Sequence, residues 1–181
     1  MDLDSLVDEF AKIEGAEVDR GINHPSDPSQ EDPEGIWQYL ASHPYLKLDP
    51  TYLEFLLTYG GAGIYVDLED SRNEYLRAYI AGFGTIGPDL REGDSTEPQM
   101  FDFALCDTRL PIGRKPTLVC SVFAFSIEDD MNIYEKTFHG NQDFRRMQWE
   151  PFVPTFLDWF KIFVKQRGRI TGQTRPIRKK R

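Results

Sequence analysis

Apolar residues recur at helical spacing in the first part of the chain. The apolar side chains between Leu3 and Ile13 fall on one face of a predicted helix, which a preceding aspartate can cap and Gly15 can end. A second short helix is predicted over residues 33–42, closed by a His-Pro pair. The polar, proline-containing segment 16–34 is predicted to be a loop.

The third predicted helix has the clearest boundaries. Asp49 is expected to cap it and Pro50 to occupy its first turn. The residues that follow, as far as Tyr59, are almost all apolar, so this helix should be buried on most sides. Gly60 and Gly61 should end it, because glycine takes the left-handed cap conformation without a steric penalty.

Beyond these glycines the pattern changes from helical to extended. Alternating apolar and polar residues, together with one almost continuously apolar run, predict five strands. They are a strand that begins at Gly63, followed by Tyr75–Ile80, Phe101–Leu105, Leu118–Ile127 and Ile133–Phe138. Residues 82–98 and 111–116 contain several glycines and prolines and are predicted loops.

A final amphipathic helix with an aromatic face is predicted over Phe152–Lys165. The order of helices, then strands, then one helix favours an α+β fold with N-terminal helices, a mainly antiparallel sheet and a C-terminal packing helix. We expect one domain over residues 1–166, in which residues 1–32 form a helix-and-loop extension. Residues 167–181 are expected to form a flexible basic tail.

The charge is distributed unevenly along the chain. Its 181 residues carry a net charge of −9, and 13% of them are aromatic, so a core can be buried without disulfides. Residues 161–181 hold nine basic and no acidic residues, which leaves 12 basic against 30 acidic residues, net −18, in residues 1–160. Such an acidic body repels phosphates and attracts cations, so we expect a cationic protein partner rather than nucleic acid.

The residue types that usually carry catalysis or metal binding do not form a known pattern here. Cys106 and Cys120 lie in apolar, strand-like runs, where a free cysteine behaves as a small hydrophobe, although a single buried bridge stays open. His24, His43 and His139 lack the spacing of zinc ligands. We therefore expect no enzyme activity and no cofactor.

Two glycine-rich segments could be taken for phosphate-binding loops. Residues 60–63 follow a helix and open a strand, which is the reverse of the order in dinucleotide-binding loops. Residues 82–87 run into a proline and a charged stretch. A small hydrolase or transferase built on these loops is an alternative, and it would require an acid or a histidine deep in a pocket.

Two acidic groups follow predicted strands and are the candidate partner-binding residues. They are Asp67, Glu69 and Asp70 in the first group and Glu128, Asp129 and Asp130 in the second. Neither has the register of a calcium-binding loop. A solvated surface is the simpler interpretation, and an anionic patch for a basic protein is the functional one.

Nothing in the sequence predicts a membrane protein. The chain begins Met-Asp-Leu-Asp, without the basic segment of a signal peptide, and no run approaches about 18 apolar residues. We expect a cytoplasmic protein that does not insert into membranes. The sequence does not indicate an oligomeric state.

The segment Leu48–Ile64 resembles the signature of the SUKH superfamily. That signature has an aromatic residue, a Phe-Leu pair and a polar or aromatic residue before Gly-Gly, positions held here by Tyr59, Gly60 and Gly61 and the residues before them. The closing segment Phe156–Phe160 resembles the family's final helix. An Asp-Pro pair stands where the family usually has Leu-Pro.

The resemblance implies a fold and a type of function. SUKH proteins have short helices, a curved antiparallel sheet and a last helix, and many are immunity proteins that bind and neutralise bacterial polymorphic toxins, often basic nucleases. It implies a structural role for Tyr59, Gly60 and Gly61 and a cognate cationic toxin as partner. A regulatory adaptor of the same fold with a non-toxin partner is the alternative.

Deleting residues 167–181 is expected to leave the melting temperature nearly unchanged, because this segment contains little apolar surface to bury. A thermal melt of the truncated chain against the full chain measures the difference. A loss of several degrees would mean that the segment docks on the acidic body.

Overall fold

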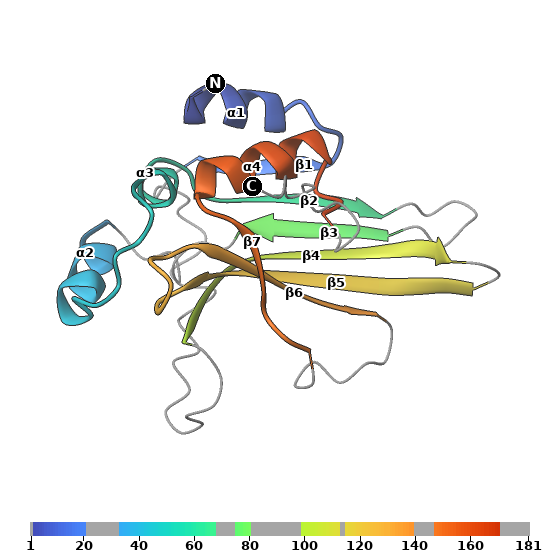
Figure 1. Cartoon of the computed structure of the whole chain (residues 1–181). Coiled ribbons are helices and arrows are strands. Elements are labelled where there is room, and N and C mark those ends of the chain that lie inside the picture. The colour runs from blue at the N-terminus through green and yellow to red at the C-terminus, as the bar shows by residue number, and fades with distance from the viewer. Residues whose placement is uncertain are drawn as a thin grey trace, which may run out of the picture.

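The fold is a single antiparallel sheet with helices packed on one side of it (Figure 1). A computed structural model describes residues 2–20, 33–67, 75–80, 99–112, 115–139 and 147–170. Its seven strands lie in sequence order, and each pairs antiparallel with the next. The predicted α+β architecture, with N-terminal helices, a curved antiparallel sheet and a C-terminal helix, is confirmed.

The four helices are α1 (Leu3–Phe10), α2 (Pro33–Ser42), α3 (Pro50–Tyr59) and α4 (Phe156–Lys165). The seven strands are β1 (Ala16–Arg20), β2 (Gly60–Asp67), β3 (Tyr75–Ile80), β4 (Met100–Ile112), β5 (Lys115–Ser126), β6 (Ile133–His139) and β7 (Glu150–Val153). None of the described helices is long and apolar enough to cross a membrane.

The predicted cap of α3 is confirmed, and the same side chain also reaches α4. Asp49 Oδ1 accepts hydrogen bonds from the backbone N–H groups of Thr51 at 2.8 Å and Tyr52 at 3.2 Å. Its other oxygen, Oδ2, accepts the N–H of Phe156 at 3.0 Å. Because the first N–H groups of a helix have no partner within it, one carboxylate here satisfies donors of two helices. At the other end of α3, Gly60 has a φ of 72°, as its predicted capping role requires.

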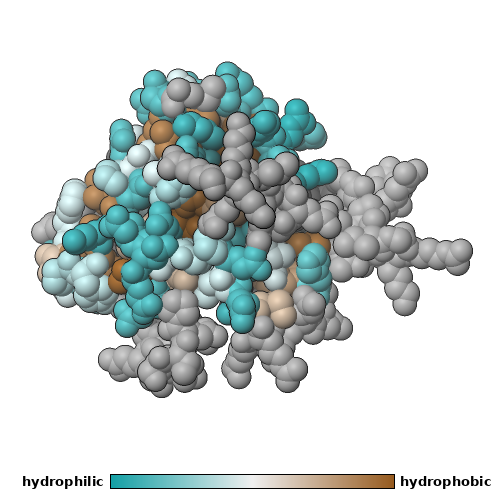
Figure 2. All heavy atoms as spheres, in the orientation of Figure 1, coloured by the Kyte–Doolittle hydropathy of each residue, from teal (hydrophilic) through white to brown (hydrophobic). Residues whose placement is uncertain are grey.

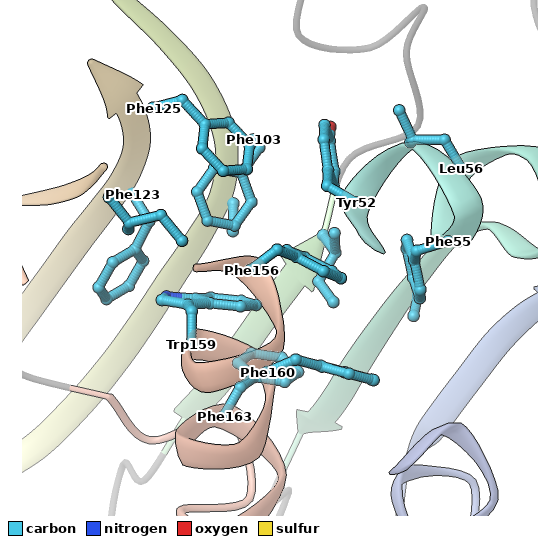
Figure 3. Packing of buried hydrophobic residues seen from close by; sticks show 14 of the residues in the cluster. Tyr52, Phe55, Leu56, Phe103, Phe123, Phe125, Phe156, Trp159, Phe160 and Phe163 are labelled. Carbon is cyan, nitrogen blue, oxygen red and sulfur yellow. The ribbon is translucent and has the colours of Figure 1, made fainter. Parts of the chain in front are cut away.

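Aromatic rings fill the space between the helices and the sheet (Figure 3). The ring of Tyr52 on α3 lies 5.1 Å from the rings of Phe125 and Phe156, centroid to centroid. Phe103 stacks on Phe125 at 4.5 Å, and Trp159 on α4 meets Phe103 edge-on at 5.0 Å. Aromatic pairs of this kind add about 0.5–1.5 kcal/mol each beyond their buried area, so this cluster holds α3 and α4 on the sheet.

The predicted strand Phe101–Leu105 lies within β4, but its side chains do not simply alternate. The pairing register with β5 shifts around Phe103, which is the extra residue of a β-bulge. Phe101 and Phe103 are both fully buried, and after the bulge Ala104 faces the core while Leu105 is half-buried. The predicted alternation is therefore wrong beyond the bulge, because one inserted residue turns every later side chain to the opposite face.

Two segments predicted as loops form strands. β1 lies within the predicted loop 16–34 and pairs with β2, which already begins at Gly60 rather than Gly63. The predicted loop 111–116 contains the end of β4 and the start of β5, paired up to Ile112 and Lys115. In both cases the partner strand supplies the hydrogen bonds, which local composition does not reveal. Residues 21–32 and the predicted loop 82–98 lie outside the described residues.

The last helix begins four residues later than predicted. Phe152 belongs to β7, and α4 starts only after Pro154 and Thr155. The residue before a proline is biased toward extended backbone, which delays the helix. Thr155 then acts as the N-cap, and its Oγ1 accepts the N–H of Asp158 at 3.2 Å.

The chain stays packed beyond α4. Ile170 is fully buried in the core. Gly168 has a φ of 74°, and a Cβ on it would lie 3.0 Å from side-chain atoms of Ala78 and Ile64. The predicted boundary after residue 166 is therefore wrong for residues 167–170. Residues 171–181 lie outside the described residues.

The buried position of Ile170 reverses the expectation for the truncated chain. Ile170→Ala should lower the free energy of unfolding by about 2–4 kcal/mol, because it leaves a cavity in the core. Deletion of residues 167–181 should cost at least as much. Urea denaturation measures both, with the exposed Arg169→Ala as a control that changes little; an unchanged Ile170→Ala variant would restore the boundary at residue 166.

Asp49→Ala is expected to lower the free energy of unfolding by about 2–3 kcal/mol, since three backbone N–H groups lose their acceptor. Asp49→Asn keeps one side-chain oxygen and should lose about half of that. Denaturation midpoints measure the effect, with the exposed Glu54→Ala on the same helix as the control. Equal stability of the Ala variant and the control would contradict the double cap.

Candidate functional site

Asp67, the one described residue of the first predicted acidic group, lies at the opposite end of the sheet from the second group. Asp67 ends β2 and is aligned, through successive ladder pairs, with Leu118 near the start of β5. Glu128–Asp130 follow Ser126 at the far end of β5 (Figure 1). About eight residues of extended strand separate these ends, which corresponds to roughly 26 Å. Asp67 and the second group therefore do not belong to one continuous patch. Glu69 and Asp70 lie outside the described residues.

The second acidic group sits on an ordered turn. Glu128, Asp129 and Asp130 are exposed, and the Tyr134 hydroxyl donates to Asp129 Oδ2 at 2.7 Å. Asp130 and Met131 adopt left-handed backbone, with φ values of 48° and 59°. Met131 is itself buried, so the turn holds its carboxylates on a fixed backbone.

The residues that match the SUKH signature join α1 to the α3–β2 junction. The Tyr59 hydroxyl donates to Asp4 Oδ1 at 2.6 Å, and its ring lies 5.7 Å from that of Phe55. Gly60 turns the chain out of α3, and Gly61 already pairs with Asp19 of β1. All three positions therefore have structural roles in this fold.

The exposed side of α1 is an acidic surface that the sequence interpretation missed. Its buried residues are Leu3, Leu6, Val7 and Phe10, and its exposed carboxylates, with the capping residue, are Asp2, Asp4, Asp8 and Glu9. No basic residue lies within this helix. Hydrogen bonds from the side chain and the N–H of Ser5 lower the pKa of Asp2. Hydrophilic residues dominate the coloured surface at the top of Figure 2, where α1 lies. The sequence contains a sign of this surface, because carboxylates occupy the helix positions between the apolar residues that are buried.

A buried carboxylate lies on the helix-covered face of the sheet. Glu135 is fully buried, and its Oε1 accepts hydrogen bonds from Ser121 Oγ at 2.9 Å and Thr137 Oγ1 at 2.7 Å. The two hydroxyls are themselves 2.8 Å apart. Such bonds offset the cost of burying a charge.

This polar cluster is closed to substrates. Ser121 and Glu135 have no solvent-exposed surface, and Phe123, the cross-strand neighbour of Glu135, lies under Trp159 at 5.3 Å. Within the described part of the chain, Trp159 Nε1 and Thr108 Oγ1 are buried polar atoms without a hydrogen bond. Glu135 and its hydroxyl donors therefore lie inside the core. A hydrolase that used them would require the core to open to its substrate.

The two cysteines cannot form the bridge that the sequence left open. Cys106 pairs with Ser121 and faces the core, whereas Cys120, the neighbour of Ser121 along β5, points to the opposite face. Burial raises the pKa of the Cys106 thiol, and the charge of Glu135 adds to this. Burial also raises the pKa of Cys120, helped by a hydrogen bond to Asp107. Neither thiol has the lowered pKa of a nucleophilic cysteine.

Two of the three histidines lie in the described part of the chain. His43 follows α2, with its Nδ1 3.0 Å from Ser42 Oγ and its ring edge-on to Tyr45 at 5.7 Å. His139 is exposed at the end of β6, and His24 lies outside the described residues. In the ranges that the structure covers, no three His, Cys, Asp or Glu residues come together in a way that could hold a metal ion.

No model of a known protein family matches the chain, and no characterised protein or solved structure matches it either. The resemblance to the SUKH superfamily therefore stays a prediction.

In the native protein, neither Cys106 nor Cys120 should react measurably with a disulfide reagent at pH 8, because burial keeps both thiols protonated. Guanidinium should expose both. The pKa of both thiols is higher in the folded chain than in the unfolded chain. Protonated thiols therefore keep the folded state at its full stability below the unfolded thiol pKa of about 8.5, and the free energy of unfolding falls as the pH rises above that value. Rapid labelling of either native thiol would contradict this.

Proposed function

We propose that this protein is a non-enzymatic binding protein for a basic protein partner, and that it acts as an immunity protein against a cationic bacterial toxin. The observation that carries the proposal is α1, whose exposed ionisable side chains are all acidic. The net charge of −18 over residues 1–160 adds a long-range field of the same sign. The SUKH resemblance of residues 48–64 supports the choice of a toxin as partner.

The acidic surface favours rapid association with a positively charged protein. Charges placed on exposed side chains steer a partner of opposite sign and raise the association rate more than they raise the affinity. The turn Glu128–Asp130 offers a second acidic surface, on a backbone that is already fixed. A protein that must neutralise a toxin as soon as the toxin appears benefits from fast association.

Co-expression with the protein encoded immediately upstream tests this function. We expect protection of the host cell and a complex that co-purifies. Absence of both protection and complex with every basic protein encoded nearby would overturn the proposal, and a complex with a basic protein that is not toxic would favour the adaptor.

Charge variants test which surface steers the partner. Asp8→Asn/Glu9→Gln and Glu128→Gln/Asp130→Asn are each expected to slow association with the partner by about threefold to tenfold at low salt, with little effect on dissociation. Lys165→Gln/Arg169→Gln, which removes exposed positive charge, is the matched control and should not slow it. Stopped-flow kinetics at several salt concentrations measure the rates; equal rates for all variants would remove the acidic surfaces from the encounter.

A further inference from the structure

The basic end of the chain takes no part in the proposed function, yet its first residues lie on the described surface. Lys161 and Lys165 are one helical turn apart on α4, and Arg167 and Arg169 follow the helix. All four side chains are exposed. Lys161 Nζ lies 3.5 Å from Asp158, an exposed pair that contributes little. We call these four residues the basic strip.

The basic strip lies on and just after the helix against which α1 packs. The two helices pack directly on each other, with Phe10 of α1 5.6 Å from Phe163 and 6.0 Å from Phe160 of α4. Between residues 2 and 17, six exposed carboxylates face a single basic residue, Lys12. We call the exposed carboxylates of α1 and its cap the acidic strip (Asp2, Asp4, Asp8 and Glu9).

A surface with an acidic strip beside a basic strip is complementary to itself. In a two-fold dimer, residue i of one copy meets residue j of the other and the reverse contact forms as well. Rotating a second copy by 180° over these helices places its acidic strip on the basic strip of the first, and its basic strip on the acidic one. A uniformly acidic surface would instead repel a copy of itself.

We propose that two copies of this chain associate through α1 and α4, with the acidic strip of each copy against the basic strip of the other. A nucleic acid is a poorer occupant, because a duplex lying on the basic strip would bring its phosphates against the neighbouring carboxylates. This inference does not rest on the proposed function. Where both hold, self-association covers the acidic strip and competes with a basic partner.

Sedimentation velocity over a range of protein concentrations, at low and at physiological salt, tests the association of the full chain. We expect a concentration-dependent dimer that weakens as the screening length falls from about 30 Å at 0.01 M to about 8 Å at 0.15 M ionic strength. A chain that stays monomeric at low salt and high concentration would overturn the proposal.

Charge reversal identifies the surface. Asp8→Lys/Glu9→Lys reverses two of the four charges of the acidic strip, and Lys165→Glu/Arg169→Glu reverses two of the four charges of the basic strip, so each variant leaves one strip without net charge. Each variant alone should associate about tenfold more weakly, because the attraction between unlike strips is lost. An equimolar mixture of the two variants should form a heterodimer, since the unaltered acidic strip of one variant can then meet the unaltered basic strip of the other. Failure of the mixture to associate, while the unaltered chain does, would overturn the arrangement.

Two controls separate this arrangement from other outcomes. Glu54→Lys/Glu128→Lys has the same change in net charge as the first variant, lies off α1, and should dimerise like the unaltered chain. Circular dichroism confirms that each variant folds. Binding of a labelled DNA duplex that Lys165→Glu/Arg169→Glu abolishes, by a chain that stays monomeric, would overturn the proposal in favour of phosphate recognition.

Discussion

One carboxylate joins the starts of two helices that lie 107 residues apart. Asp49 caps α3 with one oxygen and receives the first N–H of α4 with the other. This link sets where both helices begin over the sheet. The aromatic rings of Tyr52 and Phe156 then meet, and with them the two helices close over Phe103 and Phe125. The rest of the core follows from that seating, because α4 brings Trp159, Phe160 and Phe163 onto positions that are already fixed.

The placement of α4 in turn positions the charged surfaces. The aromatic side of α4 faces the sheet, and its other side presents lysines to solvent. Phe10 of α1 packs on Phe163 and so holds α1 against α4. The same contact turns the carboxylates of α1 outward. The core packing therefore places opposite charges on the exposed sides of two helices that contact each other. The proposed binding of a basic partner depends on the carboxylates of α1. The proposed dimer depends on these carboxylates together with the basic strip.

Much of the fold could be predicted because its signals are local. The cap at Asp49, the proline after it and the glycine at residue 60 act through bonds within a few residues, so α3 was predicted to the residue. The features that were missed depend on distant partners. β1 is a strand because β2 lies beside it, and Ile170 is buried because it joins the hydrophobic core, although it stands alone in a basic run. The bulge at Phe103 leaves no trace in an alternating pattern.

The candidate site was predicted less well than the fold, for a geometric reason. Asp67 ends β2, and Glu128 follows β5. Neighbouring antiparallel strands run in opposite directions, so β2 and β5 finish at opposite ends of the sheet. Whether two such groups meet depends on strand direction, which is a property of the whole sheet. The acidic side of α1 was missed because its carboxylates are also what any amphipathic helix shows to water.

The sequential order of the strands has a consequence for how the chain is made. From β2 onward each strand pairs with the next strand along the chain, so most of the sheet can form strand by strand during synthesis, whereas β1 pairs with β2 across the intervening helices α2 and α3. The core face of that sheet, with Phe103, Phe123 and Phe125, stays uncovered until the last part of the chain emerges with α4 and Ile170. A nascent chain thus carries an exposed aromatic surface from the completion of β5 until α4 emerges, and exposed surfaces of this kind are where aggregation begins and where chaperones bind.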